Sequence, residues 1–191
     1  MTHEVIIAGF GGQGVMLIGE LLAYAGMLEG KNVSWMPSYG PEMRGGTANC
    51  SVVVSDREVG SPVVAEPTGI IAMNGPSLDK FEGSVRPGGL IVVNLSLIPR
   101  KVKREDVKVL EVPANETAVE LGDSRVANMV ALGAFLGATR CVSKASVLEA
   151  LRHMLPKHRQ DLIALNERAL NRGIEMALAC GTAVARKGER I

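Results

Sequence analysis

Two segments near the start of the chain contain residue types that could bind an anion. The first is Gly9-Phe-Gly-Gly-Gln-Gly14, which matches the pattern G-x-G-x-x-G. Glycines permit a tight turn and close approach to the backbone, and the start of the following helix offers N–H groups and a partial positive charge. The pattern therefore predicts a phosphate or carboxylate site. Its residues are Gly9, Gly11, Gly12, Gln13 and Gly14, of which Gln13 alone has a side chain that both donates and accepts hydrogen bonds.

The second segment places a phenol, a carboxylate and a guanidinium within six residues. It is the glycine-rich stretch Ser38-Tyr-Gly-Pro-Glu-Met-Arg-Gly-Gly46. Arg44 could hold a carboxylate or phosphate through two parallel hydrogen bonds, although Glu42 and Arg44 could equally pair within the loop. The residues expected to face a ligand or a partner are Ser38, Tyr39, Glu42, Met43, Arg44, Gly45 and Gly46.

A dinucleotide is the first ligand class that the glycine pattern suggests. Such a site needs an Asp or Glu at the end of the second strand to hold the ribose hydroxyls. The expected second strand ends in Ser34-Trp-Met-Pro37, without an acid. The missing acid argues against an NAD or FAD site. An anion site stays open, and so does a purely structural role of the glycines in packing a helix on a strand.

The elements that would position these segments alternate between strands and helices. Apolar runs predict strands at 4–8, 31–36, 48–55, 69–73, 88–94 (after a turn) and 107–112, with 61–65 as a possible hairpin partner. Helices are expected at 13–28, 74–81, 127–137, 144–154 (with Ser143 as N-cap) and 158–185. Pro37 should stop the second strand, so 37–47 is expected to be a loop. This order predicts one α/β domain over residues 1–191: three-layer and Rossmann-like, with a mostly parallel sheet, helices on both faces and extra C-terminal helices.

Open α/β sheets bind ligands at the carboxyl ends of their strands, and both polar segments follow a strand. Both are therefore expected at the same edge. Asn74 and Asn94 also end apolar strands there and are secondary candidates, although an Asn in this position more often caps a turn. Asn128 lies in an apolar helix and is expected to bond to neighbouring backbone.

The composition argues against several classes of function. The formal net charge is +1, which disfavours nucleic acid or an anionic membrane as partner. The cysteines lie far apart, at Cys50, Cys141 and Cys180, so a metal or iron–sulfur site is not expected in this chain. There is no apolar stretch of membrane-spanning length and no leader pattern, and we expect a cytoplasmic protein.

Several motifs in order resemble the gamma subunit of pyruvate, 2-oxoglutarate or branched-chain 2-oxoacid ferredoxin oxidoreductases. They are GFGGQG, SYGPEMRGGTANCSVVVSD, GSPVV, NGPSLDKF and VNLSLIP. The resemblance runs from Val5 to about Ala138, and its second motif is the most specific. One departure is Gly75, where a bulkier residue would be typical.

The resemblance implies a subunit that is not an enzyme by itself, and no catalytic residue is assigned. Its partners would be alpha, beta and ferredoxin-like delta subunits that hold thiamine diphosphate, Mg and iron–sulfur clusters. The complex would decarboxylate a 2-oxoacid, form acyl-CoA from coenzyme A and reduce ferredoxin. This chain would serve assembly and line the coenzyme A or active-site entrance. The isolated chain would leave an apolar face uncovered and self-associate or bind a partner. Two alternatives stay open. The chain could be the small subunit of an indolepyruvate ferredoxin oxidoreductase, or an autonomous dinucleotide- or anion-binding protein.

Overall fold

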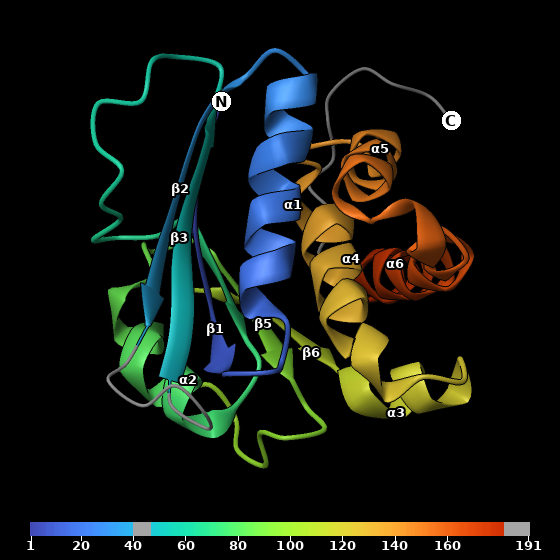
Figure 1. Ribbon diagram of the computed structural model, residues 1–191. Helices are drawn as coiled ribbons and strands as arrows, with labels where there is room; N and C mark the ends of the chain where they lie inside the picture. Colours follow the sequence, from blue (N-terminus) through green and yellow to red (C-terminus); the bar gives the residue numbers. More distant parts are fainter. Residues whose placement is uncertain (40–46, 182–191) are drawn as a thin grey trace.

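The computed structural model describes residues 1–39 and 47–181 (Figure 1). In this part of the chain, six strands form one sheet in the order β2-β3-β1-β4-β5-β6. The strands are β1 (Thr2–Phe10), β2 (Asn32–Tyr39), β3 (Thr47–Ser55), β4 (Gly69–Ala72), β5 (Leu90–Asn94) and β6 (Lys108–Val112). The strands β1, β4, β5 and β6 run parallel, whereas β3 is antiparallel to both β1 and β2. The mostly parallel α/β sheet expected from the sequence is confirmed.

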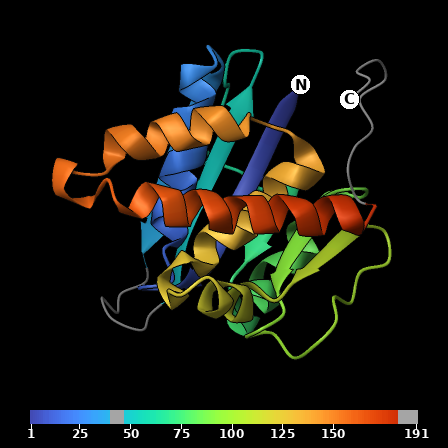
Figure 2. The same ribbon diagram turned by 90° about the vertical axis from the view of Figure 1, so that its right-hand side faces the viewer.

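Helices cover both faces of this sheet. They are α1 (Val15–Leu28), α2 (Gly75–Phe81), α3 (Ala114–Glu120), α4 (Ala127–Thr139), α5 (Lys144–Met154) and α6 (Leu162–Ala179), with short 3₁₀ turns η1 (Glu82–Ser84), η2 (Ser124–Val126) and η3 (Lys157–Arg159). Helices α1 and α4 lie on one face, with α5 and α6 stacked outside them, and α2 covers the other face (Figures 1 and 2). The three-layer arrangement and the extra C-terminal helices therefore match the expectation.

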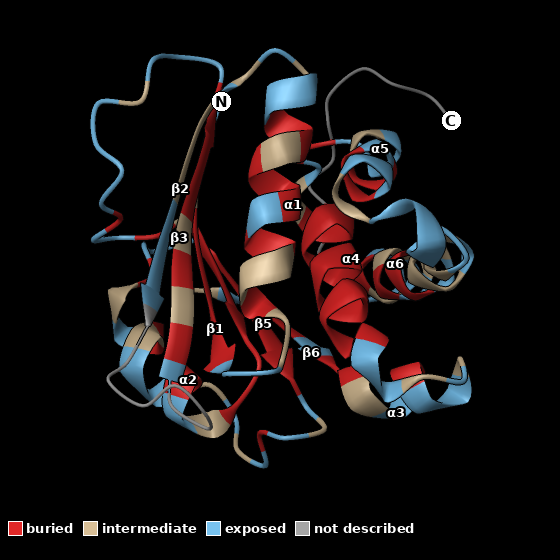
Figure 3. Cartoon of the chain, in the orientation of Figure 1, coloured by how far each residue is buried: buried red, intermediate tan, exposed pale blue. Residues whose placement is uncertain are grey.

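The core divides into two apolar clusters, one on each face of the sheet. Along β1, Val5 and Ile7 belong to the cluster on the α1 and α4 side, whereas Ile6 and Ala8 pack in the cluster that contains Leu78 of α2. Because side chains alternate between the faces and both faces are covered, this strand is apolar at every position from Val5 to Ala8. Helix α4 is buried almost all round (Figure 3). The burial explains why its sequence has no polar face.

Two glycines let the backbones of α4 and α6 touch. A Cβ atom added to Gly173 would lie 2.0 Å from the carbonyl oxygen of Val130, and one added to Gly133 would lie 2.1 Å from that of Leu170. No side chain fits at these distances, so glycine at both positions sets how deeply α6 packs on α4.

Strand β2 continues through Pro37, which corrects the expected strand end and moves residues 37–39 from the loop into the sheet. The strand lies at the edge of the sheet and pairs with β3 alone among the described strands. An edge strand tolerates a residue without an N–H group, so Pro37 does not end it. Thr47 likewise belongs to a strand, β3.

Two other expectations need correction. Residues 61–65 form no strand, because β1 and β2 already pair with the two sides of β3 that a hairpin partner would use. The last helix begins at Leu162 rather than at His158, after the 3₁₀ turn that follows Pro156. The residues beyond 181 lie outside the described part of the chain.

Helix α5 has the expected bounds. The Ser143 hydroxyl caps its start and accepts a hydrogen bond from the Ser146 N–H at 3.0 Å.

Candidate functional site

The glycine turn and the second polar segment lie at the same edge of the sheet. Gly9 at the end of β1 and Tyr39 at the end of β2 pair with opposite sides of one residue, Ala48 on β3. Ser38 lies opposite Asn49 and is exposed. Two strand spacings, about 10 Å, separate the two ends. The expected shared edge is confirmed, whereas Glu42, Met43, Arg44, Gly45 and Gly46 lie outside the described residues.

The order of the strands does not suit a dinucleotide. In a dinucleotide-binding sheet, the strand that carries the ribose-binding acid lies beside the strand that precedes the glycine turn. Here β3 lies between them, and it runs in the opposite direction. The described end of β2, Pro37-Ser38-Tyr39, also contains no acid. Both observations argue against a nicotinamide or flavin dinucleotide at this turn.

The glycines of the turn have different roles. Gly12 and Gly14 adopt φ of 95° and 73°, a left-handed conformation that favours glycine. A Cβ atom on Gly9 would lie 2.6 Å from Gln13 Oε1, and one on Gly14 would lie 2.3 Å from Asn128 Nδ2. These two glycines are therefore required for packing. Gly12 is exposed, and no heavy atom lies within 4 Å of its would-be Cβ, so its backbone is open to a ligand.

The side chain of Gln13 joins the turn to the end of β4. Its Oε1 accepts hydrogen bonds from the backbone N–H of Phe10 at 2.6 Å and from Nδ2 of Asn74 at 3.1 Å. Its Nε2 donates to the carbonyl oxygen of Met73 at 3.3 Å. The sequence singled out Gln13 because it both donates and accepts. In the structure the Gln13 amide donates and accepts hydrogen bonds to other groups of the protein, so its role is to position the turn.

The hydrogen bonds continue across two further strand ends. Nδ2 of Asn94 donates to the Met73 carbonyl oxygen at 3.2 Å and to Oδ1 of Asn115 at 2.9 Å. We call Gln13, Asn74, Asn94 and Asn115 the amide chain. Asn94 is 1% exposed, and its Oδ1 has no hydrogen-bond partner among the described residues. The amide chain fixes the carboxyl ends of β1, β4 and β5 relative to one another.

The sequence predicted Gln13, Asn74 and Asn94 at this edge as separate candidates. The structure joins them by hydrogen bonds and adds Asn115. The signal for Asn115 was available, because it follows the end of β6 by only three residues. Its backbone N–H donates to the Ser96 hydroxyl at 3.0 Å. That hydroxyl also bonds to Glu116 and holds the pKa of the Glu116 carboxyl below its usual value. The edge therefore carries an ionised carboxylate beside the amide chain.

The expected local roles of two asparagines are confirmed. Oδ1 of Asn74 accepts from the Ser77 N–H at 2.9 Å and caps α2. Asn128 is buried, donates to the Gly14 carbonyl oxygen at 3.3 Å and accepts from the Met129 N–H at 2.9 Å. Asn128 therefore bonds to backbone, and it holds the last glycine of the turn against α4.

No group of three or more His, Cys, Asp or Glu side chains is placed to hold a metal ion within residues 1–39 and 47–181. The cysteines form no disulfide; Cys50 and Cys141 are buried and Cys180 is exposed. Burial raises the pKa of the Cys50 thiol to about 12, so it is a neutral residue packed in β3. The described helices include none that is long and apolar enough to cross a membrane.

The carboxyl edge of this Rossmann-like domain carries a glycine turn and the amide chain. Beside β1, the sheet has an antiparallel strand where a dinucleotide-binding sheet has a parallel one. The domain therefore lies outside the dinucleotide-binding class. Comparison with known families identifies one that matches this chain. Residues 4–176 match the model described as pyruvate ferredoxin/flavodoxin oxidoreductase. The chain belongs to that family.

Individual relatives carry related names. The chain is 42% identical over 176 residues to the ketoisovalerate oxidoreductase subunit VorA of Methanothermobacter marburgensis. The aligned region covers 91% of this chain and 36% of VorA. It thus spans about a third of that relative's length. A keto/oxoacid ferredoxin oxidoreductase gamma subunit from Geobacter sulfurreducens superposes with a TM-score of 0.79 at 31% identity, over 93% of this chain and 99% of that one.

A larger solved protein contains the same fold. It is a 2-oxoglutarate:ferredoxin oxidoreductase from Magnetococcus marinus with 2-oxoglutarate, coenzyme A and succinyl-CoA bound. The TM-score is 0.84 at 26% identity, and the match covers 93% of this chain but 31% of that one. The fold described here is therefore found both as a separate gamma subunit and as part of a longer chain.

Proposed function

We propose that this chain is the gamma subunit, or gamma-type portion, of a 2-oxoacid:ferredoxin oxidoreductase. The complex oxidatively decarboxylates a 2-oxoacid to acyl-CoA and CO₂ and passes the electrons to ferredoxin. The observation that carries this proposal is the likeness to a gamma subunit over nearly the whole of both chains. We propose no separate activity of the isolated chain, because Gln13, the polar side chain of the glycine turn, uses its amide for hydrogen bonds within the protein.

The chemistry is assigned to partners. We propose alpha, beta and ferredoxin-like delta subunits that hold thiamine diphosphate, Mg and iron–sulfur clusters, with coenzyme A as co-substrate of the complex. Residues 1–191 form one gamma-type domain in this proposal. We place the complex in the cytoplasm, because free cysteines without disulfides suit a reducing compartment.

The carboxyl edge is the part of this chain proposed to face its partners and the coenzyme A or active-site entrance. Gly12 offers open backbone there. Three apolar side chains at strand ends along this edge are partly exposed: Phe10 at 36%, Leu95 at 45% and Leu97 at 44%. Exposed apolar side chains beside ordered polar groups are typical of protein interfaces. The second segment, with Ser38, Tyr39, Glu42, Met43, Arg44, Gly45 and Gly46, is proposed to extend this surface.

Affinity purification tests the assembly. The chain would carry a tag in its native host, be purified without oxygen, and be examined for co-purifying proteins, thiamine and iron. We expect larger, brown partners that reduce a viologen when given coenzyme A and one of a panel of 2-oxoacids. The preferred 2-oxoacid identifies the substrate. A colourless chain that purifies alone and inactive would refute the assignment.

A further inference from the structure

A pocket of about 170 Å³ lies beside the turn that joins α5 to α6, and we call it the leucine socket. Six aliphatic side chains supply its apolar surface: Leu17, Val126, Leu151, Leu155, Leu162 and Leu165. The rest of its wall consists of Asp123, Arg125, Asn128, Arg159 and Asn166. The turn projects from the body of the molecule (Figure 2), and Arg125 and Arg159 are exposed, so the leucine socket can be reached from solvent.

The volume of the leucine socket decides which kind of group it can hold. Sites for drug-sized molecules and cofactors occupy about 300–1,000 Å³, so a socket of about 170 Å³ is too small for them. An apolar cavity of about 150 Å³ is large enough for benzene. The leucine socket therefore fits one apolar side chain of up to phenyl size. A single buried side chain of this kind often carries much of the binding energy of a protein interface.

The turn beside the leucine socket is basic. Its 3₁₀ segment η3 consists of Lys157, His158 and Arg159, all exposed. Within residues 1–39 and 47–181, neither the Lys157 ammonium nor the Arg159 guanidinium has a carboxylate partner. Asp161 follows the turn in the sequence but forms no ion pair with either of them. Cations of this kind beside an apolar pocket favour an occupant that carries negative charge next to an apolar group.

The acid in the wall of the leucine socket is already paired. Arg125 donates to the Asp123 carboxylate from Nε at 3.0 Å and from Nη2 at 2.6 Å. These hydrogen bonds lower the pKa of Asp123 to about 2, so this carboxylate is ionised and held by Arg125 at neutral pH. Arg159 is the cation of the wall that an incoming carboxylate would meet.

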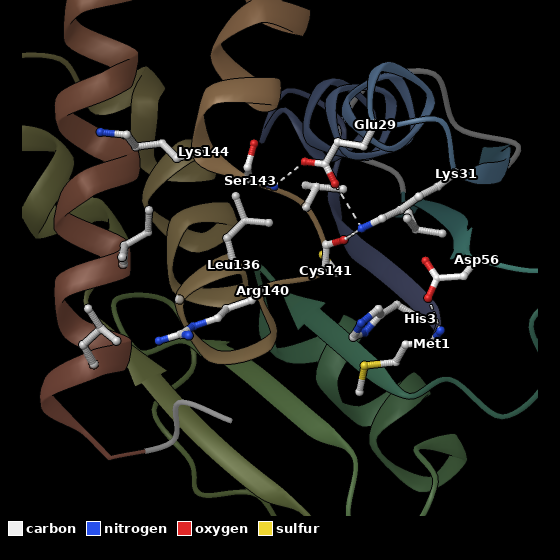
Figure 4. A pocket seen from close by; sticks show the side chains of 15 residues that line it. Met1, His3, Glu29, Lys31, Asp56, Leu136, Arg140, Cys141, Ser143 and Lys144 are labelled. Atoms are coloured by element: carbon white, nitrogen blue, oxygen red, sulfur yellow. Dashed lines mark hydrogen bonds and ion pairs between the residues drawn. The ribbon is translucent and has the colours of Figure 1, made fainter. Parts of the chain in front are cut away.

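A larger pocket, of about 730 Å³, opens at the amino-end edge of the sheet, but its charged groups are paired (Figure 4). The Lys31 ammonium bonds to the Glu29 carboxylate and to the Cys141 carbonyl oxygen, and Asp56 bonds to the N-terminal ammonium. These groups satisfy one another without a ligand. The leucine socket differs, because the cations beside it have no carboxylate partner among the described residues.

We propose that the leucine socket receives one phenylalanine- or leucine-sized side chain from an acidic segment of another protein, with carboxylates of that segment at Arg159 and Lys157. The inference holds whether that protein is a subunit of the proposed complex or a separate partner. Charge complementarity selects an acidic segment, and the volume selects a single apolar anchor. The competing explanation is a packing gap between α1, α5 and α6 beside a solvated basic turn, which requires no partner.

Peptide titrations of the ¹⁵N-labelled full chain, followed by amide chemical shifts, test this proposal. The probes are acetyl-Glu-Glu-Phe-Glu-Glu-amide, the same peptide with leucine or alanine in place of phenylalanine, and one with glutamine in place of every glutamate. At low salt, where surface charges are least screened, we expect saturable shifts of residues around the leucine socket. Alanine should weaken binding by about tenfold or more, because the buried anchor is lost. Glutamine should weaken it by about fivefold, since exposed charge pairs contribute less.

Two variants and a control locate the binding. Arg159→Met removes a charge from an exposed side chain, so it should weaken the glutamate peptide about threefold and leave the glutamine peptide unchanged. Leu162→Trp should fill the leucine socket and abolish saturable binding. Leu162 is half-buried and, unlike Leu155 and Leu165, is not packed against the core cluster of α1 and α4. Arg168→Met, an exposed arginine of α6 outside the socket lining, should bind like the parent chain.

Three results would overturn the proposal: no saturable shifts with either the phenylalanine or the leucine peptide, shifts confined to residues away from the leucine socket, or equal binding of the glutamate and glutamine peptides. Shifts of the socket residues when the chain is concentrated without peptide would identify a second copy of the chain as the occupant, and would overturn it as well.

Discussion

Replacing Gly173 with alanine should lower the free energy of unfolding by about 3 kcal/mol, the upper part of the range for overpacked cores. The added methyl group would lie 2.0 Å from the Val130 carbonyl oxygen and 2.6 Å from the Ala134 backbone nitrogen. Backbone of a buried helix cannot move aside as a flexible side chain can, so α6 must shift outward from α4. Urea unfolding of the two full chains, followed by circular dichroism, measures the loss.

Gly75→Ala is the matched control for this substitution. Gly75 also lies in a helix, α2, but no heavy atom is within 4 Å of its would-be Cβ. Alanine there should be neutral or stabilise by up to about 1 kcal/mol, since it restricts the unfolded chain. The open space would also accommodate the bulkier residue that the resemblance leads one to expect at this position. If Gly173→Ala were as stable as Gly75→Ala, the close contact between α4 and α6 would be wrong.

Replacing Gly14 with alanine should destabilise the protein by about 2–3 kcal/mol and disorder the glycine turn. The left-handed backbone costs a non-glycine residue about 1–2 kcal/mol. The methyl group would also lie 2.3 Å from Asn128 Nδ2 and displace the amide that bonds to the Gly14 carbonyl oxygen, at about 1 kcal/mol more. Hydrogen exchange of residues 10–18, measured together with urea unfolding, reports on both effects.

Gly12→Ala separates these two causes, because Gly12 has a positive φ of 95° but no neighbour within 4 Å of its would-be Cβ. It should cost only the backbone part, about 1–2 kcal/mol. Adding Asn128→Ala to Gly14→Ala should recover about 1 kcal/mol relative to the sum of the single effects, since the two groups are in contact. Equal costs for Gly12→Ala and Gly14→Ala, with additive double-variant behaviour, would contradict the proposed packing of Asn128 under the turn.

The sequence predicted the class of fold but not the direction of β3. Residues 48–55 form an apolar run that both a parallel and an antiparallel strand can have when both faces are covered. Pairing with β1 depends on the chain direction after Tyr39, which no local pattern records. The same pairing explains two errors, since it leaves β2 at an edge that tolerates Pro37 and leaves no free side of β3 for residues 61–65.

The candidate site was predicted in pieces. Strand-end positions placed Gln13, Asn74 and Asn94 at one edge, because parallel strands bring their carboxyl ends together. That they bond through the Met73 carbonyl oxygen depends on side-chain rotamers and sheet twist, which the sequence does not encode locally. A pocket at the opposite, amino-end edge of the sheet had no sequence signal, because the residues that line it come from segments as far apart as Met1 and Leu178.

If this chain is the proposed gamma subunit, the 2-oxoacid:ferredoxin oxidoreductase cannot work without it. The most direct measurement is the rate of coenzyme A-dependent viologen reduction by the partner subunits, expressed with and without this chain. We expect little or no turnover without the chain and restored turnover when the purified chain is added back. Full turnover by the partner subunits alone would contradict it.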